Sequence, residues 1–260
     1  MIKISKSIEH VVFLNYKNLH PTGSWDEFKD YQQGEVYKNI KNIIFRDQFD
    51  LCAYCEVSLP PNIVFERRIE HFKSKSGCDV HVDNWHLDWD NLLGVCLGGS
   101  NLKDKFDLPR NLSCDAYKEH YETINNIVDK NWLGRLLFPL DIPHGHHFFV
   151  FLRATGEIKP NSRYCNDINI NNNAYESTEV LVEKTIDIFN LNCERLKLAR
   201  IEIFRDFERA FSSFRKNDDI TTFKNLVIRW SRGNPSFFQT TRDIILRESS
   251  LAVKVMNGDL

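Results

Sequence analysis

The sequence predicts an α+β protein that is mainly helical, with a small zinc-stabilised module between helical regions. Apolar residues recur at helical spacing between residues 25 and 49 and again from about residue 176. Residues 50–120 differ, because they hold short apolar runs and five of the seven cysteines. We therefore divide the chain into an N-terminal helical segment (1–49), the module (50–130), and a hairpin with a C-terminal helical region (131–260).

The composition is that of an ordinary globular protein. The chain has 260 residues, 42% hydrophobic and 27% charged, with 34 lysines and arginines, 36 aspartates and glutamates, and a formal charge of −2. These values exclude a long disordered chain and a uniformly basic nucleic-acid binder, but they allow a local basic groove. No apolar stretch approaches the ~20 residues that span a bilayer, and no secretion signal is recognisable, so we expect a cytoplasmic protein.

The N-terminal segment is predicted to contain one long helix. Residues 1–24 hold a short apolar run and a turn signal at residues 21–23. A helix is predicted over residues 25–49, because most of its apolar side chains lie three or four positions apart. These positions are Trp25, Phe28, Tyr31, Val36, Ile40, Ile43, Ile44 and Phe45.

The C-terminal part is predicted to hold a hairpin, a linker and long helices. Residues 147–160 predict a β-hairpin with a turn at Thr155-Gly156, and the Asn-rich residues 161–175 predict a polar linker. From about residue 176 the period is helical, and a last amphipathic segment runs from about 218 to 251 with a break near residues 233–235. One apolar stripe is interpreted as core, with a partner-binding face as the alternative: Leu198, Ile201, Phe204, Phe207, Phe211 and Phe214.

The cysteines favour a metal site over disulfides, because seven is an odd number and cytoplasmic thiols stay reduced. Cys52 and Cys55 form a C-x2-C turn that presents two thiolates to a tetrahedral zinc ion. A free pair or a redox dithiol is the alternative, although no βαβ context supports the latter. Cys96 and Cys114 are the predicted third and fourth ligands, with Cys78 as a competitor for the fourth place. The remaining two are expected to be buried thiols: Cys165 and Cys193.

Between the cysteine pairs, Glu70 stands next to His71 with cations on both sides. Such a set suits phosphodiester hydrolysis, because a histidine can accept a proton from water, a carboxylate can hold a divalent cation, and cations can position phosphates. A Glu-His pair alone is also common on protein surfaces. The segment N-L-L-G-V-C (91–96) follows, and C-D-A-Y-K (114–118) opens a predicted helix that Asp115 is placed to cap.

The order of these motifs resembles the HNH endonucleases of the ββα-metal class. The sequence looks most similar to the subfamily with a long insertion between the third and fourth zinc cysteines, the PtuB nuclease subunits of Septu anti-phage systems, including those attached to retrons. The segments that carry the resemblance are C-A-Y-C-E, I-E-H-F-x-x-K-S, W-D-N-L-L-G-V-C-x-G-G and C-D-x-x-K. Further similar segments extend it over roughly residues 35–205: F-P-L-D-I, T-G-E-I-K and F-N-L-N-C-E-R-L.

The resemblance implies a role for each matched residue. His71 would be the general base, and Asn91 would hold the loop that orients it. Glu70 and Asp115 would be the ligands of a catalytic Mg²⁺ or Mn²⁺ ion, since both offer hard oxygens. The cations near the motif are the candidate phosphate contacts: Arg67, Arg68, Lys73, Lys75 and Lys118.

The chain departs from the simple HNH pattern in two places. Asp115 stands where a histidine or asparagine is usual, so the metal preference can differ. Lys118 is followed by Glu119 and His120, where related sequences often have a glycine and an acid, and each is either an auxiliary ligand or a solvated helix residue. A further group of histidines is expected to lie in an ordinary loop: His144, His146 and His147.

The predicted function is a metal-dependent endonuclease of an anti-phage system. By resemblance, its partners would be a PtuA-like ATPase and, in a retron, the reverse transcriptase with its RNA–DNA product (msDNA); the C-terminal helices are candidates for the ATPase contact. Two alternatives stay open: an RNA substrate such as tRNA, or a zinc-organised scaffold subunit without catalysis. A zinc deaminase would need H-x-E followed by P-C-x-x-C, and neither occurs.

Overall fold

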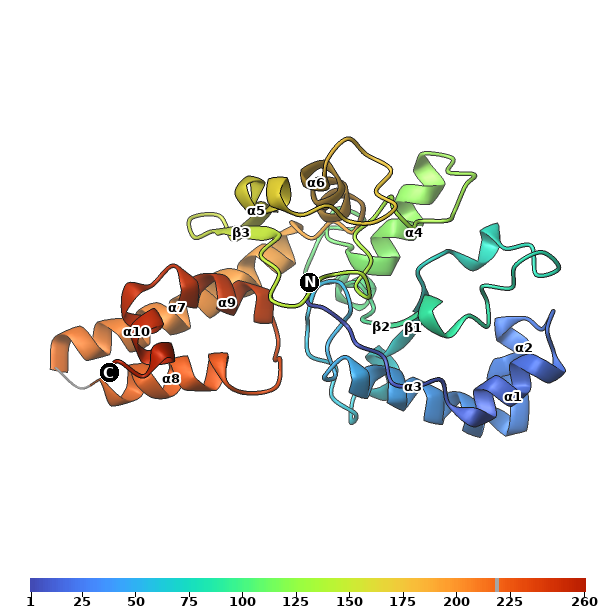
Figure 1. Cartoon of the computed structure of the whole chain (residues 1–260), viewed down its shortest axis with the longest axis horizontal. Coiled ribbons are helices and arrows are strands. Elements are labelled where there is room, and N and C mark those ends of the chain that lie inside the picture. Colours follow the sequence, from blue (N-terminus) through green and yellow to red (C-terminus); the bar gives the residue numbers. More distant parts are fainter. Residues whose placement is uncertain (218–219) are drawn as a thin grey trace.

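The computed structural model describes residues 1–217 and 220–260. Helices make up most of the regular structure, and two separate antiparallel sheets of two strands each complete it (Figure 1). This confirms a mixed fold of helices and small sheets, in which about half of the described residues are helical. Among the described residues, no helix combines the length and the apolar character needed to cross a membrane.

The N-terminal segment forms α1 (Val11–Leu19), α2 (Trp25–Asp30) and α3 (Glu35–Asp47), so the prediction of one helix over residues 25–49 is wrong. The backbone of Gln32 and Gln33 adopts positive φ angles of 49° and 58°, which interrupt the helix between α2 and α3. Apolar spacing cannot reveal such a break, because residues on both sides still pack into one core. Ser24 and Glu27 form a capping box at the start of α2.

The central unit consists of β1 (Arg68–His71), β2 (Leu92–Val95) and α4 (Cys114–Ile124), in this order along the chain. The two strands are antiparallel, and His71 pairs with Leu92 at one end of the ladder. Gly94 lets α3 pack closely behind β2, because a Cβ there would lie 2.9 Å from the ring of Phe45. The side chain of Gln48 also bonds to both the N–H and the carbonyl of Gly94, at 2.7 and 2.8 Å. Helix α3 therefore fixes the strand pair from one side.

The predicted hairpin is confirmed as β3 (Phe149–Leu152) paired with β4 (Glu157–Pro160). The Asn-rich segment 161–175 is not entirely a linker, because it contains the short helix α5 (Ser162–Asp167). Asn161 explains this difference, since its side chain accepts a hydrogen bond from Tyr164 N–H and caps the helix. Helix α6 (Thr178–Ile188) follows, as the helical period from about residue 176 predicts.

The C-terminal region begins with the 24-residue helix α7, which leads away from the centre of the molecule (Figure 1). Its apolar stripe packs mainly into the core, as predicted, because Phe207 is buried and contacts the rings of Phe223 and Trp230, although Leu198 is 49% exposed. The predicted start of the last segment, near Asp218, lies outside the described residues. The break near residues 233–235 is confirmed, and a second break divides the rest, so the elements are α7 (Glu194–Asn217), α8 (Thr221–Ser231), α9 (Gln239–Arg247) and α10 (Ser250–Asn257).

Candidate active site and zinc centre

The four cysteines predicted to bind zinc form one buried cluster. The Sγ atoms of Cys52 and Cys114 are 3.8 Å apart, those of Cys55 and Cys96 3.7 Å, and those of Cys96 and Cys114 3.9 Å. All four lie within 4.8 Å of one another. A tetrahedral zinc ion with bonds of about 2.3 Å requires sulfur atoms about 3.8 Å apart. The cluster therefore has the dimensions of a closed structural zinc site.

The two ends of the long 97–113 segment are hydrogen-bonded to each other next to the cluster. Ser113 N–H donates to the carbonyl of Gly98 (2.9 Å), and Gly98 N–H donates to Sγ of Cys96 (3.3 Å). Gly98 has a φ of 62°, and a Cβ there would lie 2.3 Å from the Ser113 carbonyl oxygen. Gly98, two residues after Cys96, thus allows Cys114 to lie beside Cys96 although the 97–113 segment separates them in the sequence.

The other three cysteines lie outside this cluster. Cys78, the competitor for the fourth place, is half-buried and donates its S–H to the carbonyl of Asp83 (3.3 Å). Cys165 and Cys193 are buried, as predicted for ordinary core thiols. Burial raises the pKa of Cys114 well above its usual value, so a cation is needed to hold that thiol as a thiolate.

The cluster also connects the central unit with the C-terminal helices. The ring of Tyr54 stacks on that of Phe189, with centroids 3.9 Å apart. The buried carboxylate of Glu56 accepts from Thr240 N–H (2.8 Å), and its backbone carbonyl accepts from Phe238 N–H (3.0 Å). The C-x2-C turn is therefore a junction between two parts of the fold.

His71 ends β1 and has a buried side chain. Its Nε2 lies 3.0 Å from the carbonyl oxygen of His86. A carbonyl only accepts hydrogen bonds, so Nε2 carries the hydrogen and Nδ1 keeps its lone pair. Burial lowers the pKa of His71 to about 3, which leaves the ring neutral at physiological pH. Trp25 of α2 packs edge-on against this ring, with centroids 4.8 Å apart.

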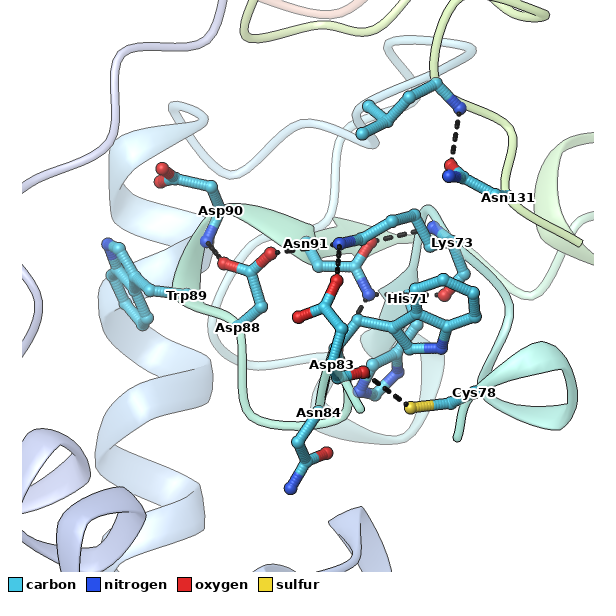
Figure 2. Close-up of polar contacts among 12 residues, drawn as sticks. His71, Lys73, Cys78, Asp83, Asn84, Asp88, Trp89, Asp90, Asn91 and Asn131 are labelled. Carbon is cyan, nitrogen blue, oxygen red and sulfur yellow. Dashed lines mark hydrogen bonds and ion pairs between the residues drawn. The ribbon is translucent and has the colours of Figure 1, made fainter. Parts of the chain in front are cut away.

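Asn91 is buried just before β2 and joins both ends of the loop that separates the strands. Its Oδ1 accepts from Lys73 N–H (2.7 Å), and its Nδ2 donates to the Lys73 carbonyl (3.2 Å) and the Trp85 carbonyl (2.8 Å). Figure 2 shows this amide hydrogen-bonded to the backbone of Lys73. The Trp85 contact is one residue from the His86 carbonyl that holds His71. Asn91 therefore fixes the backbone around the histidine.

Glu70 and Asp115 bring two carboxylates together from β1 and α4. Burial raises the pKa of Glu70 well above its usual value, and the negative charge of Asp115 adds to this effect. The ammonium of Lys118 forms an ion pair with Glu70 and lies 3.4 Å from each of the His71 and Phe72 carbonyls. Asp115 lies in the first turn of α4 and does not cap it, because Ser113 occupies the position before the helix.

These residues line a cavity of about 720 Å³. His71, Glu70 and Asp115 lie on its wall together with Arg68 and Lys75. Arg68 has a side chain that is 45% exposed, and its guanidinium lies 3.7 Å from the Asp115 carboxylate. Glu70, His71 and Asp115 therefore share one solvent-accessible cavity with four of the five predicted phosphate contacts: Arg67, Arg68, Lys75 and Lys118.

Three of the predicted phosphate contacts, Arg67, Lys73 and Lys118, have largely buried side chains that are bound to acids. Two of them, Arg67 and Lys118, still line the cavity. Arg67 pairs with Asp50 at 2.9 Å. Lys118 pairs with Glu70, as described above. The Lys73 ammonium lies 3.4 Å from Asp88 and 3.8 Å from Asp83 (Figure 2). These charges are already neutralised within the protein.

A comparison with curated proteins finds a relative that matches this chain throughout. It is 45% identical over 260 residues, covering 100% of this chain and 99% of the relative, which is named "Retron Ec83 putative HNH endonuclease" and comes from Escherichia coli. The chain belongs to the HNH endonuclease family. It is therefore an enzyme of the class that hydrolyses nucleic-acid phosphodiester bonds. A scan of protein-family models finds no match.

Sequence reasoning missed several residues around the site of this HNH endonuclease. Lys29 of α2 and Lys130, after α4, also line the cavity. Trp25 and His86 contact His71 directly, through ring packing and a backbone carbonyl. A local motif gave no signal for these residues, because Trp25 and Lys29 lie more than forty positions before the histidine.

The remaining polar candidates of the HNH chain are separated by the fold. Glu119 lines the same cavity as His71, whereas the ring of His120 packs 5.7 Å from that of Tyr117. The histidine group at residues 144–147 lines a second cavity of about 430 Å³, between the N-terminal residues and helices α8 and α9. Among the described residues, only the four cysteines form a group that could hold a metal through three or more His, Cys, Asp or Glu ligands.

Proposed function

We propose that this chain is a metal-dependent endonuclease whose β1–β2–α4 unit is the ββα-metal active site. The observation that carries the proposal is His71, a neutral buried histidine with a defined tautomer, in the same cavity as two carboxylates. A general base needs a free lone pair next to the water that it deprotonates. The Nδ1 atom supplies this lone pair, since Nε2–H is engaged by His86.

The other residues of the site have supporting roles. Nδ1 of His71 accepts a proton from the attacking water, while Asn91 keeps the surrounding backbone in place. Arg68 and Lys75 attract and orient the phosphates of the substrate. We assign Lys118 as the internal counter-ion of Glu70, because its ammonium is buried against that carboxylate.

Glu70 and Asp115 would hold Mg²⁺ or Mn²⁺. They fit this role because both offer hard oxygen ligands. Burial and the charge of Asp115 together raise the pKa of Glu70, and a divalent cation would offset both effects. When bound, the ion stabilises negative charge on the phosphoryl group and the leaving oxygen. The four-cysteine cluster would hold a structural Zn²⁺, because its sulfur separations match a tetrahedral site.

The proposed biological setting is a retron-associated Septu defence system. The retron named in the 45%-identical relative supports the setting, and the motif resemblance to PtuB supports the Septu assignment. In such a system the chain acts with a PtuA-like ATPase, and with the retron reverse transcriptase and its msDNA. We take DNA as the substrate, with tRNA cleavage as the alternative outcome of the test.

The decisive experiment compares wild-type protein with His71→Ala in its complex with the co-expressed neighbours. Supercoiled plasmid, phage DNA and total tRNA are each incubated with Mg²⁺ or Mn²⁺. We expect His71→Ala to lower the cleavage rate by about 10²–10⁴-fold while the complex still assembles, because general-base catalysis contributes that much. The matched control is His81→Ala, an exposed histidine of the same loop. Equal rates for His71→Ala and wild type would disprove the mechanism.

The scaffold alternative is tested in infected cells. The double variant Glu70→Gln/His71→Ala removes the proposed chemistry and keeps every cysteine. We expect it to lose protection against phage while its zinc content stays at the wild-type level. Full protection by this variant would show that the chain acts as a zinc-organised scaffold.

A further inference from the structure

The start of α2 contacts the loop between β1 and β2 (residues 72–91) at His86. None of the sequence motifs includes this residue. The carbonyl of His86 accepts the hydrogen bond from His71, so its position determines the tautomer and the orientation of the proposed base. Any group that fixes the His86 backbone therefore also acts on His71.

The ring of His86 is held by hydrogen bonds on both sides. Trp25 N–H donates to Nδ1 of His86 (3.3 Å), and Nε2 of His86 lies 3.2 Å from the carbonyl oxygen of Lys75. The two contacts are consistent with a single neutral tautomer, because Nδ1 must accept and Nε2 must donate. The ring thus bridges the start of α2 and the segment that follows β1.

Asn84 strengthens the same junction. Its Nδ2 donates to the carbonyls of Pro21 and Gly23, each at 2.9 Å, and its Oδ1 accepts from His86 N–H (3.1 Å). Two side chains of the loop therefore bind the turn that leads into α2. Trp25, the first residue of α2, is also the residue whose indole packs against the His71 ring.

We propose that His86 is a positioning residue for His71, and that through it the N-terminal helical segment forms part of the catalytic unit. The proposal rests on the role of His71 as the general base. His86 lines the same cavity, and it acts through its ring, which holds its own carbonyl against Nε2–H of His71. Loss of the ring contacts frees the carbonyl, so that the His71 ring can rotate or change tautomer.

The test uses His86→Ala and His86→Asn in the full chain with zinc bound. Asparagine keeps an acceptor close to the place of Nδ1, so it preserves the bond from Trp25 N–H, whereas alanine removes both ring contacts. We expect His86→Ala to lower the single-turnover cleavage rate of supercoiled plasmid about 10- to 100-fold, with substrate affinity changed less than about twofold. His86→Asn restores most of the rate, and His81→Ala is the control. A His86→Ala rate within about twofold of that control would overturn the proposal.

A second measurement does not depend on nuclease activity. Long-range ¹H–¹⁵N spectra of histidine-labelled protein report the tautomer of each ring, and His71→Ala identifies the His71 signals. We expect the Nε2–H tautomer in wild type and His86→Asn, and a mixture of tautomers in His86→Ala. An unchanged His71 tautomer in His86→Ala would refute positioning even if cleavage is lost. If His71→Ala leaves cleavage intact, the proposed function fails, while this spectrum still decides the role of His86. If His86→Ala does not fold, Asn84→Ala replaces it, and unchanged His71 signals in that variant count against the proposal.

Discussion

Single cations near the active site differ in whether a protein carboxylate already binds them. The Lys73 ammonium lies between Asp88 and Asp83 and 5.1 Å from the centre of the Trp85 ring. Lys75, two residues later, lies on the wall of the catalytic cavity. Residues of the same type and almost the same place in the sequence thus have different surroundings. The first lies against acids of its own loop, and the second faces the cavity.

This difference predicts opposite phenotypes for the two lysines. Lys75→Ala is expected to weaken nucleic-acid binding and to reduce the slope of log K against log salt by about one, because one phosphate contact is lost. Lys73→Met keeps the apolar stem and is expected to leave that slope unchanged. It lowers the free energy of unfolding by about 1 kcal/mol, since its acidic partners are partly exposed. Fluorescence anisotropy at several salt concentrations and urea unfolding measure the two effects. A reduced slope for Lys73→Met would contradict the assignment.

Helix α9 carries a carboxyl group, that of Asp243, whose burial disfavours the charged form. Asp243 lies on the wall of the second cavity, and Gln239 Nε2 donates to its Oδ1 (2.7 Å). Burial raises the pKa of Asp243 from 3.8 to about 6. Because the folded pKa lies above the unfolded one, ionisation of this group opposes folding. The penalty is absent below about pH 4 and complete above about pH 6.

Asp243→Asn should therefore stabilise the protein in a pH-dependent way. The amide removes the charge and keeps an oxygen that accepts from Gln239. We expect a gain of up to about 3 kcal/mol in the free energy of unfolding at pH 7.5, and almost none near pH 4. Denaturant unfolding at both pH values gives the comparison, with the exposed Asp259→Asn as the matched control. A gain of the same size at both pH values would show that ionisation of Asp243 is not its source.

At the scale of the whole molecule, the cysteine cluster holds together segments that are far apart in the sequence. It joins the C-x2-C turn, the end of β2 and the start of α4, while Tyr54 and Glu56 contact residues close to α6 and in α9. Helices α8–α10 lie at the opposite end of the molecule from α1 and α2 (Figure 1). The cysteine cluster therefore lies between the two ends of the fold.

Removal of zinc is predicted to destabilise the elements on both sides of the cysteine cluster, α4 and α9. Structural zinc binding contributes on the order of 10 kcal/mol, about as much as the whole stability of a typical domain. We expect wild-type protein to contain one zinc ion, and Cys55→Ser to lose it, together with hydrogen-exchange protection in α4 and in α9. Cys78→Ser is the control, because Cys78 lies outside the cluster and should keep both properties. Full protection in metal-free protein would show that the cluster is not a structural centre.

Features that depend on local spacing could be predicted from the sequence. The C-x2-C turn and two later cysteines predicted the four-cysteine cluster, the 147–160 pattern predicted the hairpin, and the ordered motifs predicted the HNH family. Each of these signals is carried by side chains at fixed separations along the chain, and backbone geometry converts such separations directly into proximity.

The availability of each charge and the surroundings of His71 depend on tertiary packing and could not be predicted in this way. The acids that bind Arg67 and Lys118 come from other segments of the chain, whereas those that bind Lys73 lie in its own loop. Trp25, which packs on His71, also comes from a distant segment. The break between α2 and α3 depends on two left-handed residues that the apolar pattern does not distinguish. Contacts between distant segments arise from the way in which the helices and strands pack. Such contacts have no fixed spacing in the sequence, so the sequence does not predict them.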